Sequence, residues 1–304
     1  MLRYATAQPQ ISASLLGYTY DPGVHAIRAI RGIPGAALLA ETVDADFHIA
    51  RAVVSPARNF ALTISTAGDV RLVDWSSGAP SSTVLAGLAR RPDFLIFSNS
   101  GLAAVAADSQ SGQVQVITSL PASPAIQDVP LEGNPAPAAI AVNDDATIAM
   151  AFPDSVRLSG TALAPFSLPL PGAAALAFAP SGRDLLAVTG SGDLYVARNV
   201  ENGANIQKLA SDSRFSDVIA IQFSGDASSA FIASRTGVVS SVDLDSGAIT
   251  ALSCQCVPTA LDRLAGADLF RLTGITRYPV LLFDGTPQQR RLWFVPAGDG
   301  RKAR

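Results

Sequence analysis

Apolar and polar positions alternate along short stretches of the chain, and the same order of stretches recurs. Each unit begins with an apolar run, passes through a turn of small polar residues, and continues with three further runs separated by turns. Such alternation is the pattern of half-buried β-strands, and no helical stripe with a 3.6-residue period extends beyond about ten residues. The pattern therefore predicts an all-β chain.

The first turn of each unit gives the period of the repeat. The turn follows an apolar anchor residue, and six anchors are found, the last with the weakest turn: Val54, Phe97, Val142, Phe178, Phe223 and Leu264. Their spacings are 43, 45, 36, 45 and 41 residues, with a mean of 42. Four short strands in about 40–45 residues are typical of one blade of a β-propeller. The spacing predicts a single β-propeller domain with four-stranded antiparallel blades.

The second half of each unit supports this period. Residues 238–244 alternate as a strand, the turn Asp245-Ser246-Gly247 follows, and residues 248–252 return. Glycine, aspartate, asparagine and serine gather at such turns because hairpins often need positive φ angles, which these residues tolerate. The same layout recurs at residues 70–78, 113–118 and 193–203.

Two stretches carry a resemblance to known repeats. FAPSGRDLLAV (residues 178–188) and VVSSVDLDSGAIT (residues 238–250) resemble the YVTN-type and WD40-like β-propeller families, over roughly residues 50–297. The chain also resembles uncharacterised bacterial propellers with a GIPGAA opening (residues 32–37) and a cysteine pair before the last blade. The Gly-His and Trp-Asp pairs of true WD40 blades are missing, since Asp74-Trp75 is reversed. The resemblance implies the fold and no activity.

The number of blades follows from the segment before the first anchor. Residues 15–20, the turn Asp21-Pro22-Gly23 and residues 26–31 are interpreted as the third and fourth strands of a further blade. We therefore expect seven blades, with six blades and an added amino-terminal hairpin as the alternative. The predicted organisation is a tail or signal-peptide remnant at 1–13, the propeller at 14–297 and a tail at 298–304.

Composition limits the partners. Hydrophobic residues make up 48% of the chain and charged residues 15%, which excludes a disordered chain. The net charge of −3 argues against nucleic acid as a partner. No apolar stretch approaches the 18 residues of a transmembrane segment. The expected partner is a protein or a small ligand.

The amino terminus suggests a location. Ala5-Thr6-Ala7 matches the small-x-small pattern before a signal cleavage site, although no apolar core precedes it. One hypothesis is that Ala7/Gln8 is the cleavage junction of a periplasmic or secreted protein whose signal peptide begins upstream. The alternative is an ordinary tail of a cytoplasmic protein.

Cys254 and Cys256 are the only cysteines. In an extended strand their Cα atoms would lie about 6.5–7 Å apart, near or past the limit for a disulfide, so a bridge would need a local kink. Val257-Pro258 is one place for such a kink. The favoured interpretation is two free, small apolar side chains at a blade joint. The functional alternatives are a redox pair or half of a soft-metal site.

No other residues form a recognisable catalytic motif. His25 and His48 are the only histidines and are interpreted as surface or strand-end residues. Three acidic pairs are candidate calcium ligands, but they are better explained as turn residues, since aspartate side chains bond to the backbone of turns: Asp44/Asp46, Asp144/Asp145 and Asp243/Asp245. Tryptophan docking repeats and sialidase boxes are missing. We therefore assign no catalytic, cofactor-binding or metal-ligating residue and expect no cofactor.

Two function classes remain. The leading hypothesis is a non-catalytic binding or scaffold propeller that presents a loop face or its central channel to a protein or small ligand. The alternative is a lactonase-like hydrolase with acidic residues and arginines at the channel mouth. Four or more charged side chains at one channel end would favour the hydrolase, and an apolar or merely polar channel would favour binding. A redox role of Cys254 and Cys256 is a third hypothesis.

Overall fold

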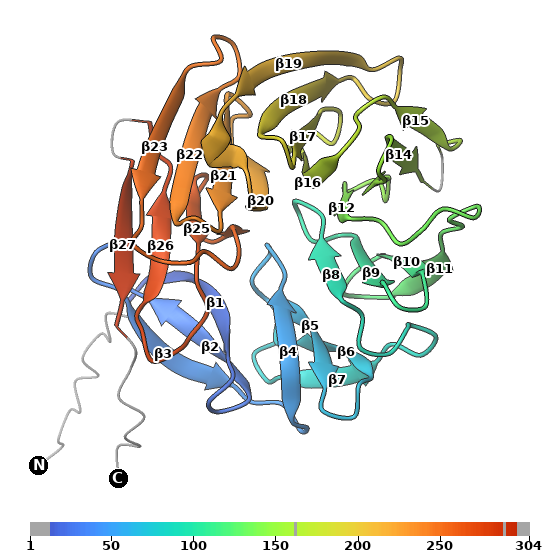
Figure 1. Ribbon diagram of the computed structural model, residues 1–304. Coiled ribbons are helices and arrows are strands. Elements are labelled where there is room, and N and C mark those ends of the chain that lie inside the picture. The colour runs from blue at the N-terminus through green and yellow to red at the C-terminus, as the bar shows by residue number, and fades with distance from the viewer. Residues whose placement is uncertain (1–12, 161–162, 288–289, 297–304) are drawn as a thin grey trace, which may run out of the picture.

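The computed structural model describes residues 13–160, 163–287 and 290–296. Seven antiparallel sheets form the blades of a β-propeller and are arranged in a ring (Figure 1), and their innermost strands surround a central channel. The 3-10 helix η1 (Ser213–Phe215) is the one helix within these ranges, and nothing helical there has the length and apolar character to cross a membrane. The all-β, seven-bladed prediction is confirmed, and the six-bladed alternative is wrong. The predicted tails lie outside the described residues, apart from Ala13.

Blades 1 to 7 are numbered in chain order, and each is made of consecutive strands. Blade 1 contains β1 (Leu15–Asp21), β2 (Ala26–Arg31) and β3 (Leu38–Val43). Blade 2 contains β4 (Ile49–Val54), β5 (Phe60–Ser65), β6 (Val70–Asp74) and β7 (Ser81–Val84), and blade 3 contains β8 (Phe94–Phe97), β9 (Ala104–Asp108), β10 (Gln113–Thr118) and β11 (Ala125–Asp128). Blade 4 contains β12 (Ala139–Val142), β13 (Ile148–Ala151), β14 (Val156–Ser159) and β15 (Phe166–Leu168).

The remaining three blades follow the same four-stranded layout. Blade 5 contains β16 (Ala173–Phe178), β17 (Leu185–Thr189), β18 (Asp193–Arg198) and β19 (Asn205–Ser211). Blade 6 contains β20 (Val218–Phe223), β21 (Ser229–Ser234), β22 (Val238–Asp243) and β23 (Ile249–Ser253). Blade 7 contains β24 (Asp262–Arg263), β25 (Leu269–Arg271), β26 (Val280–Asp284) and β27 (Arg291–Val295).

The six anchor residues mark the same place in blades 2 to 7. Each anchor lies at the end of a first strand or directly after it, and the polar turn that follows leads to the second strand. Asn143 shows how such a turn is held, because its side-chain carbonyl accepts hydrogen bonds from the N–H groups of Asp145 and Thr147. The first strands therefore share one direction along the channel.

Blade 1 differs from the predicted layout. Its strands β1, β2 and β3 begin 45, 44 and 43 residues before β5, β6 and β7 of blade 2, which are second, third and fourth strands. Residues 15–20 and 26–31 are thus the second and third strands of a blade, and their assignment as third and fourth strands is wrong. The sequence pattern of one hairpin is the same at either position, so the alternation did not distinguish them. Among the described residues, blade 1 contains no first strand.

The direction of β1 follows from this position. In blades 2 to 6 the last strand leads to the first strand of the next blade, and β3 leads to β4 in the same way. Strand β3 therefore runs opposite to β4, as every fourth strand runs opposite to the first strand after it. Because β3 pairs antiparallel with β2, and β2 with β1, strand β1 has the direction of β3 and runs opposite to the other six innermost strands. Contacts agree: Tyr20 near the end of β1 donates to the carbonyl of Ile49 at the start of β4. At the beginning of β1, the carbonyl of Leu16 accepts from Ala265, just past the end of β24.

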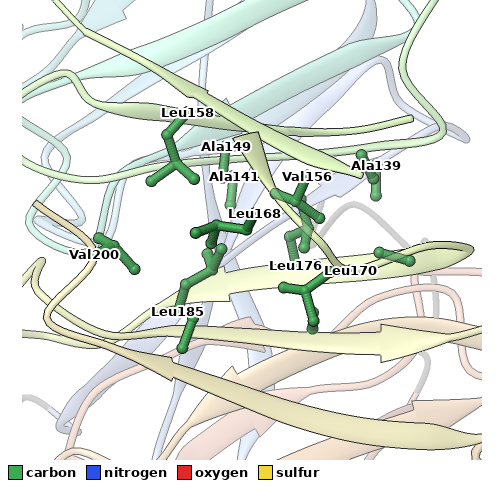
Figure 2. Packing of buried hydrophobic residues seen from close by; sticks show 14 of the residues in the cluster. Ala139, Ala141, Ala149, Val156, Leu158, Leu168, Leu170, Leu176, Leu185 and Val200 are labelled. Atoms are coloured by element: carbon green, nitrogen blue, oxygen red, sulfur yellow. The ribbon is translucent and has the colours of Figure 1, made fainter. Parts of the chain in front are cut away.

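The core lies between neighbouring blades rather than inside each sheet. Figure 2 shows one cluster, in which Ala149 and Leu158 of blade 4 lie near Leu176 and Leu185 of blade 5. Ala149 and Leu185 have no exposed surface. The small alanine side chains let the sheets approach closely, and burial of each valine or leucine contributes roughly 1.5–3 kcal/mol before conformational entropy is counted.

Blades 7 and 1 close the ring by packing. Leu16 and Ile30 of blade 1 share an apolar cluster with Leu264 and Leu282 of blade 7. Gly17 fits closely at this joint: a Cβ there would lie 2.6 Å from Cδ2 of Leu264, so the leucine side chain would have to shift. Within the part of the chain that the structure describes, no sheet combines strands from both ends of the chain.

Candidate functional site

The central channel contains a cavity of about 770 Å³ that all seven innermost strands line. Blades 2 to 7 contribute their first strands, and blade 1 contributes residues 17–20 of β1. At blade 1 the lining strand β1 runs opposite to the other six lining strands. The cavity is accordingly asymmetric, with the tyrosines of β1 on one side.

Among the described residues, six charged side chains line this cavity, five arginines and one aspartate: Arg51, Arg58, Arg235, Asp262, Arg263 and Arg271. We call the end where the first strands begin the N-terminal end of the channel, and the opposite end the C-terminal end. The cavity lining is thus strongly positive, although the whole chain has a net charge of −3. Such a surface attracts anions.

Arg51 defines the N-terminal end. It is the third residue of β4, and its Nη1 donates to the carbonyls of Pro92 and Asp93, at 3.4 Å and 2.7 Å, just before β8 begins. The side chain is exposed to the channel, but surrounding protein lowers its pKa by desolvation, and the charges of Asp93 and Asp262 oppose that shift. Both bonds hold the guanidinium at the mouth of the channel.

Arg235 and Arg271 lie at the same end. Arg235 follows β21, and its N–H donates to the carbonyl of Asp217, just before β20 begins. Arg271 ends β25 opposite Asp262, and the two side chains form an ion pair. The Nη1 of Arg271 also donates to the carbonyl of Thr273 at 3.0 Å. Asp262 is the one carboxylate among the lining residues that the structure describes, and its charge is balanced by that of Arg271.

Arg263 and Arg58 lie toward the C-terminal end. The Nη2 of Arg263 donates to the carbonyl of Phe223 at 2.5 Å, and its guanidinium lies 4.7 Å from the centre of the Phe270 ring. Burial lowers the pKa of Arg263, and the charge of Asp268 opposes this. Arg58 belongs to the turn after β4, where its carbonyl accepts from the indole of Trp75. The guanidinium of Arg263 therefore has a structural role.

Tyr18 and Tyr20 form the wall at blade 1. The hydroxyl of Tyr20 donates to the carbonyl of Ile49 at 2.7 Å, and burial raises its pKa, with the charge of Asp21 as a smaller cause. The ring of Tyr18 lies edge-on to Trp75, with centroids 5.1 Å apart. These contacts join blade 1 to blade 2.

Cys254 and Cys256 form a disulfide, with Cα atoms 5.1 Å apart. The distance is shorter than in an extended strand because Gln255 has a φ angle of 48°. The favoured interpretation as free thiols is wrong, since the chain takes the kink that the alternative required, at Gln255 rather than at Val257-Pro258. Cys254 is nevertheless buried between blades 6 and 7. A redox role stays a prediction.

The histidines and acidic pairs lie away from the cavity lining. His25 and His48 are exposed, with ring centroids 6.1 Å apart. Asp243 accepts from the N–H groups of Asp245 and Ser246, as expected for a turn residue. Within the described ranges, no group of three histidine, cysteine, aspartate or glutamate side chains is placed to hold a metal ion.

The residues that converge at the N-terminal end were not predicted individually. In the described part of the chain they number four: Arg51, Arg235, Asp262 and Arg271. This number meets the criterion that favours a hydrolase, although three of the four are cations. The one sequence signal is Arg51, which interrupts the otherwise apolar run of residues 49–54. Arg235 and Arg271 carry no signal, because only the closed ring brings them near Arg51.

Comparisons with known proteins show the fold. No family model and no curated protein matches this chain. A solved protein of unknown function from Desulfotomaculum acetoxidans has 12% identity and a TM-score of 0.61, covering 89% of this chain and 92% of that one. A candidate 6-phosphogluconolactonase from Bacteroides fragilis has 14% identity and a TM-score of 0.65, covering 96% of both chains. The propeller domain of Cps50 (Swd1) from Myceliophteria thermophila has 14% identity and a TM-score of 0.59, covering 83% and 88%.

These likenesses establish a β-propeller, and the site adds an arginine-lined central cavity. At sequence identities of 12–14%, these structural neighbours show only that the fold is shared. What the protein binds must be argued from its own side chains.

Proposed function

We propose that this protein is a non-catalytic binding propeller whose central channel binds a small anionic ligand. The observation that carries the proposal is the set of arginines at the N-terminal end, where Arg51 and Arg235 are exposed to the channel. A carboxylate or phosphate accepts two parallel hydrogen bonds from one guanidinium, so arginine is well suited to such ligands.

The roles of the charged residues differ. Arg51 and Arg235 contact the ligand directly, while Arg271 neutralises Asp262 so that no unpaired carboxylate repels an anion. A cavity of about 770 Å³ lies within the range of about 300–1,000 Å³ that small-molecule sites occupy. The same arginines would suit an acidic segment of a partner protein, but their position on the lining of the central channel favours a small molecule.

The Cys254–Cys256 disulfide supports a location outside the reducing cytoplasm. Disulfides persist in the periplasm and in secreted proteins, where thiols are not kept reduced. We accordingly propose a periplasmic or secreted protein of the YVTN-type or WD40-like repeat kind.

A lactonase-like hydrolase is the second candidate. The convergence of four charged side chains favours it, and one structural neighbour carries a lactonase name. Lactone hydrolysis by a side chain needs a general base or nucleophile near the bound carbonyl. Among the described lining residues Asp262 is the one carboxylate, and it is already paired with Arg271.

Calorimetric titration tests the proposal. The probes are 6-phosphogluconate, which carries a carboxylate and a phosphate, inorganic phosphate, and uncharged glucose as the control. Saturable binding of an anionic probe, weakened by added salt, is the expected result. Equal or absent heats for all three probes would overturn the proposal. Opening of 6-phosphogluconolactone faster than the buffer rate, abolished in Asp262→Asn, would establish the hydrolase instead.

A further inference from the structure

The segment that contains the disulfide connects the two arginine-bearing parts of the N-terminal end. Residues 254–261 link β23 to β24 without forming a strand or helix, and residues 257–261 line the cavity. A change in this segment therefore reaches the ligand site directly.

The first half of the segment packs on the turn that carries Arg235. The N–H of Cys254 donates to the carbonyl of Gly237 at 2.8 Å. Gly237 has a φ angle of +84°, and a Cβ at this position would lie 2.6 Å from the carbonyl oxygen of Cys256. Both cysteines thus lie against Gly237, two residues after Arg235.

The second half is attached to the strand that carries Arg271. The N–H groups of Thr259 and Ala260 both donate to the carbonyl of Leu272, at 2.8 Å and 3.2 Å. The segment then ends at Asp262, which pairs with Arg271. The disulfide-containing segment, residues 254–261, therefore fixes the position of Arg235 relative to the Asp262–Arg271 pair.

We infer that the Cys254–Cys256 disulfide is a redox switch that sets the affinity of the channel for its anionic ligand. This inference rests on the proposed function and adds its regulation. The disulfide holds the two Cα atoms 5.1 Å apart, whereas two extended residues span about 6.6–7.2 Å. Reduction lets the segment lengthen by up to about 2 Å and releases Gln255 from its left-handed conformation, which moves Arg235 relative to Arg271.

The reductant is a dithiol. Its thiolate attacks the sulfur of Cys256, which is partly exposed beside the exposed Val257, and the S–S bond breaks to release the Cys254 thiolate. The second thiol of the reductant then attacks the mixed disulfide, releasing the Cys256 thiolate and a cyclic disulfide. Two electrons pass from the dithiol to the protein, and its two protons end on the two cysteines.

The test compares the same chain in two redox states. Binding of 6-phosphogluconate is titrated before and after treatment with dithiothreitol, while a thiol reagent counts free cysteines. We expect the count to rise from zero to two and the affinity to fall about tenfold, within the usual range for coupled sites. The Cys254→Ser/Cys256→Ser variant should bind 6-phosphogluconate with the affinity of the reduced protein, and dithiothreitol should not change that affinity. Equal affinity with two titratable thiols would overturn the inference.

A second readout needs no ligand. Amide hydrogen exchange should become faster on reduction at residues 235–237 and 257–262, and should stay unchanged at the opposite end, at residues 55–59. Unchanged exchange at the first two segments would contradict the switch even if no probe binds. Absence of binding in the oxidised protein, with faster exchange on reduction, would instead contradict the proposed function alone.

Discussion

Arg263 and Arg51 lie toward opposite ends of the channel and differ in how their guanidinium groups are bonded. At the C-terminal end the guanidinium of Arg263 is used within the fold, through its bond to the carbonyl of Phe223 and its position over the Phe270 ring. At the N-terminal end Arg51 bonds through one nitrogen and remains exposed, and Arg235 is also exposed. The difference shows that an arginine lining a channel indicates a ligand site only where acceptors within the protein do not already use its guanidinium N–H groups.

The largest effect is expected on stability, when the arginine that bonds within the fold is removed. Arg263→Ala should lower the free energy of unfolding by about 2 kcal/mol, because a charge-assisted bond to a buried carbonyl and a cation–π contact are lost. Affinity for 6-phosphogluconate should stay within about twofold of the unmodified protein. Urea unfolding and calorimetry check both values. Lost affinity at unchanged stability would mean that the ligand lies at the C-terminal end.

A smaller effect is expected from the single lining carboxylate. Asp262→Asn removes a negative charge at the N-terminal end and leaves Arg271 without its ionic partner. Affinity for the anionic probe should rise about threefold to tenfold, and the gain should shrink at high salt. Titrations at two ionic strengths measure this change. A lower affinity would show instead that Asp262 holds Arg271 in its binding position.

The smallest predicted effect concerns acid stability at the C-terminal end. Hydrogen bonds from Ser224 and Ser228 lower the pKa of Asp226 to about 2, in the turn between β20 and β21. A depressed folded-state pKa stabilises the fold above about pH 4, and this contribution is lost as the pH falls toward 2. Because the residue is exposed, the contribution is a fraction of 1 kcal/mol. Asp226→Asn should flatten the pH dependence of unfolding in that interval, while an unchanged slope would contradict the assignment.

The sequence predicted the fold better than the site. The turn after Phe178 identified a blade because turns rich in glycine, proline and serine recur at the same place in successive repeats of the sequence. The position of β1 within blade 1 was not predictable, since a hairpin has the same alternation wherever it lies in a sheet. Arg235 and Arg51 meet through closure of the whole ring, which no local pattern encodes. The disulfide depended on a positive φ angle at Gln255, a residue that rarely adopts one.

The most direct test is a matched pair of variants at the two ends. Arg51→Ala and Arg58→Ala each remove one arginine from the cavity lining, at the N-terminal and the C-terminal end respectively. Calorimetric titration with 6-phosphogluconate should show about a 10–100-fold loss of affinity for Arg51→Ala and less than about a twofold change for Arg58→Ala. Equal losses in both variants, or a loss confined to Arg58→Ala, would contradict an anion site at the N-terminal end.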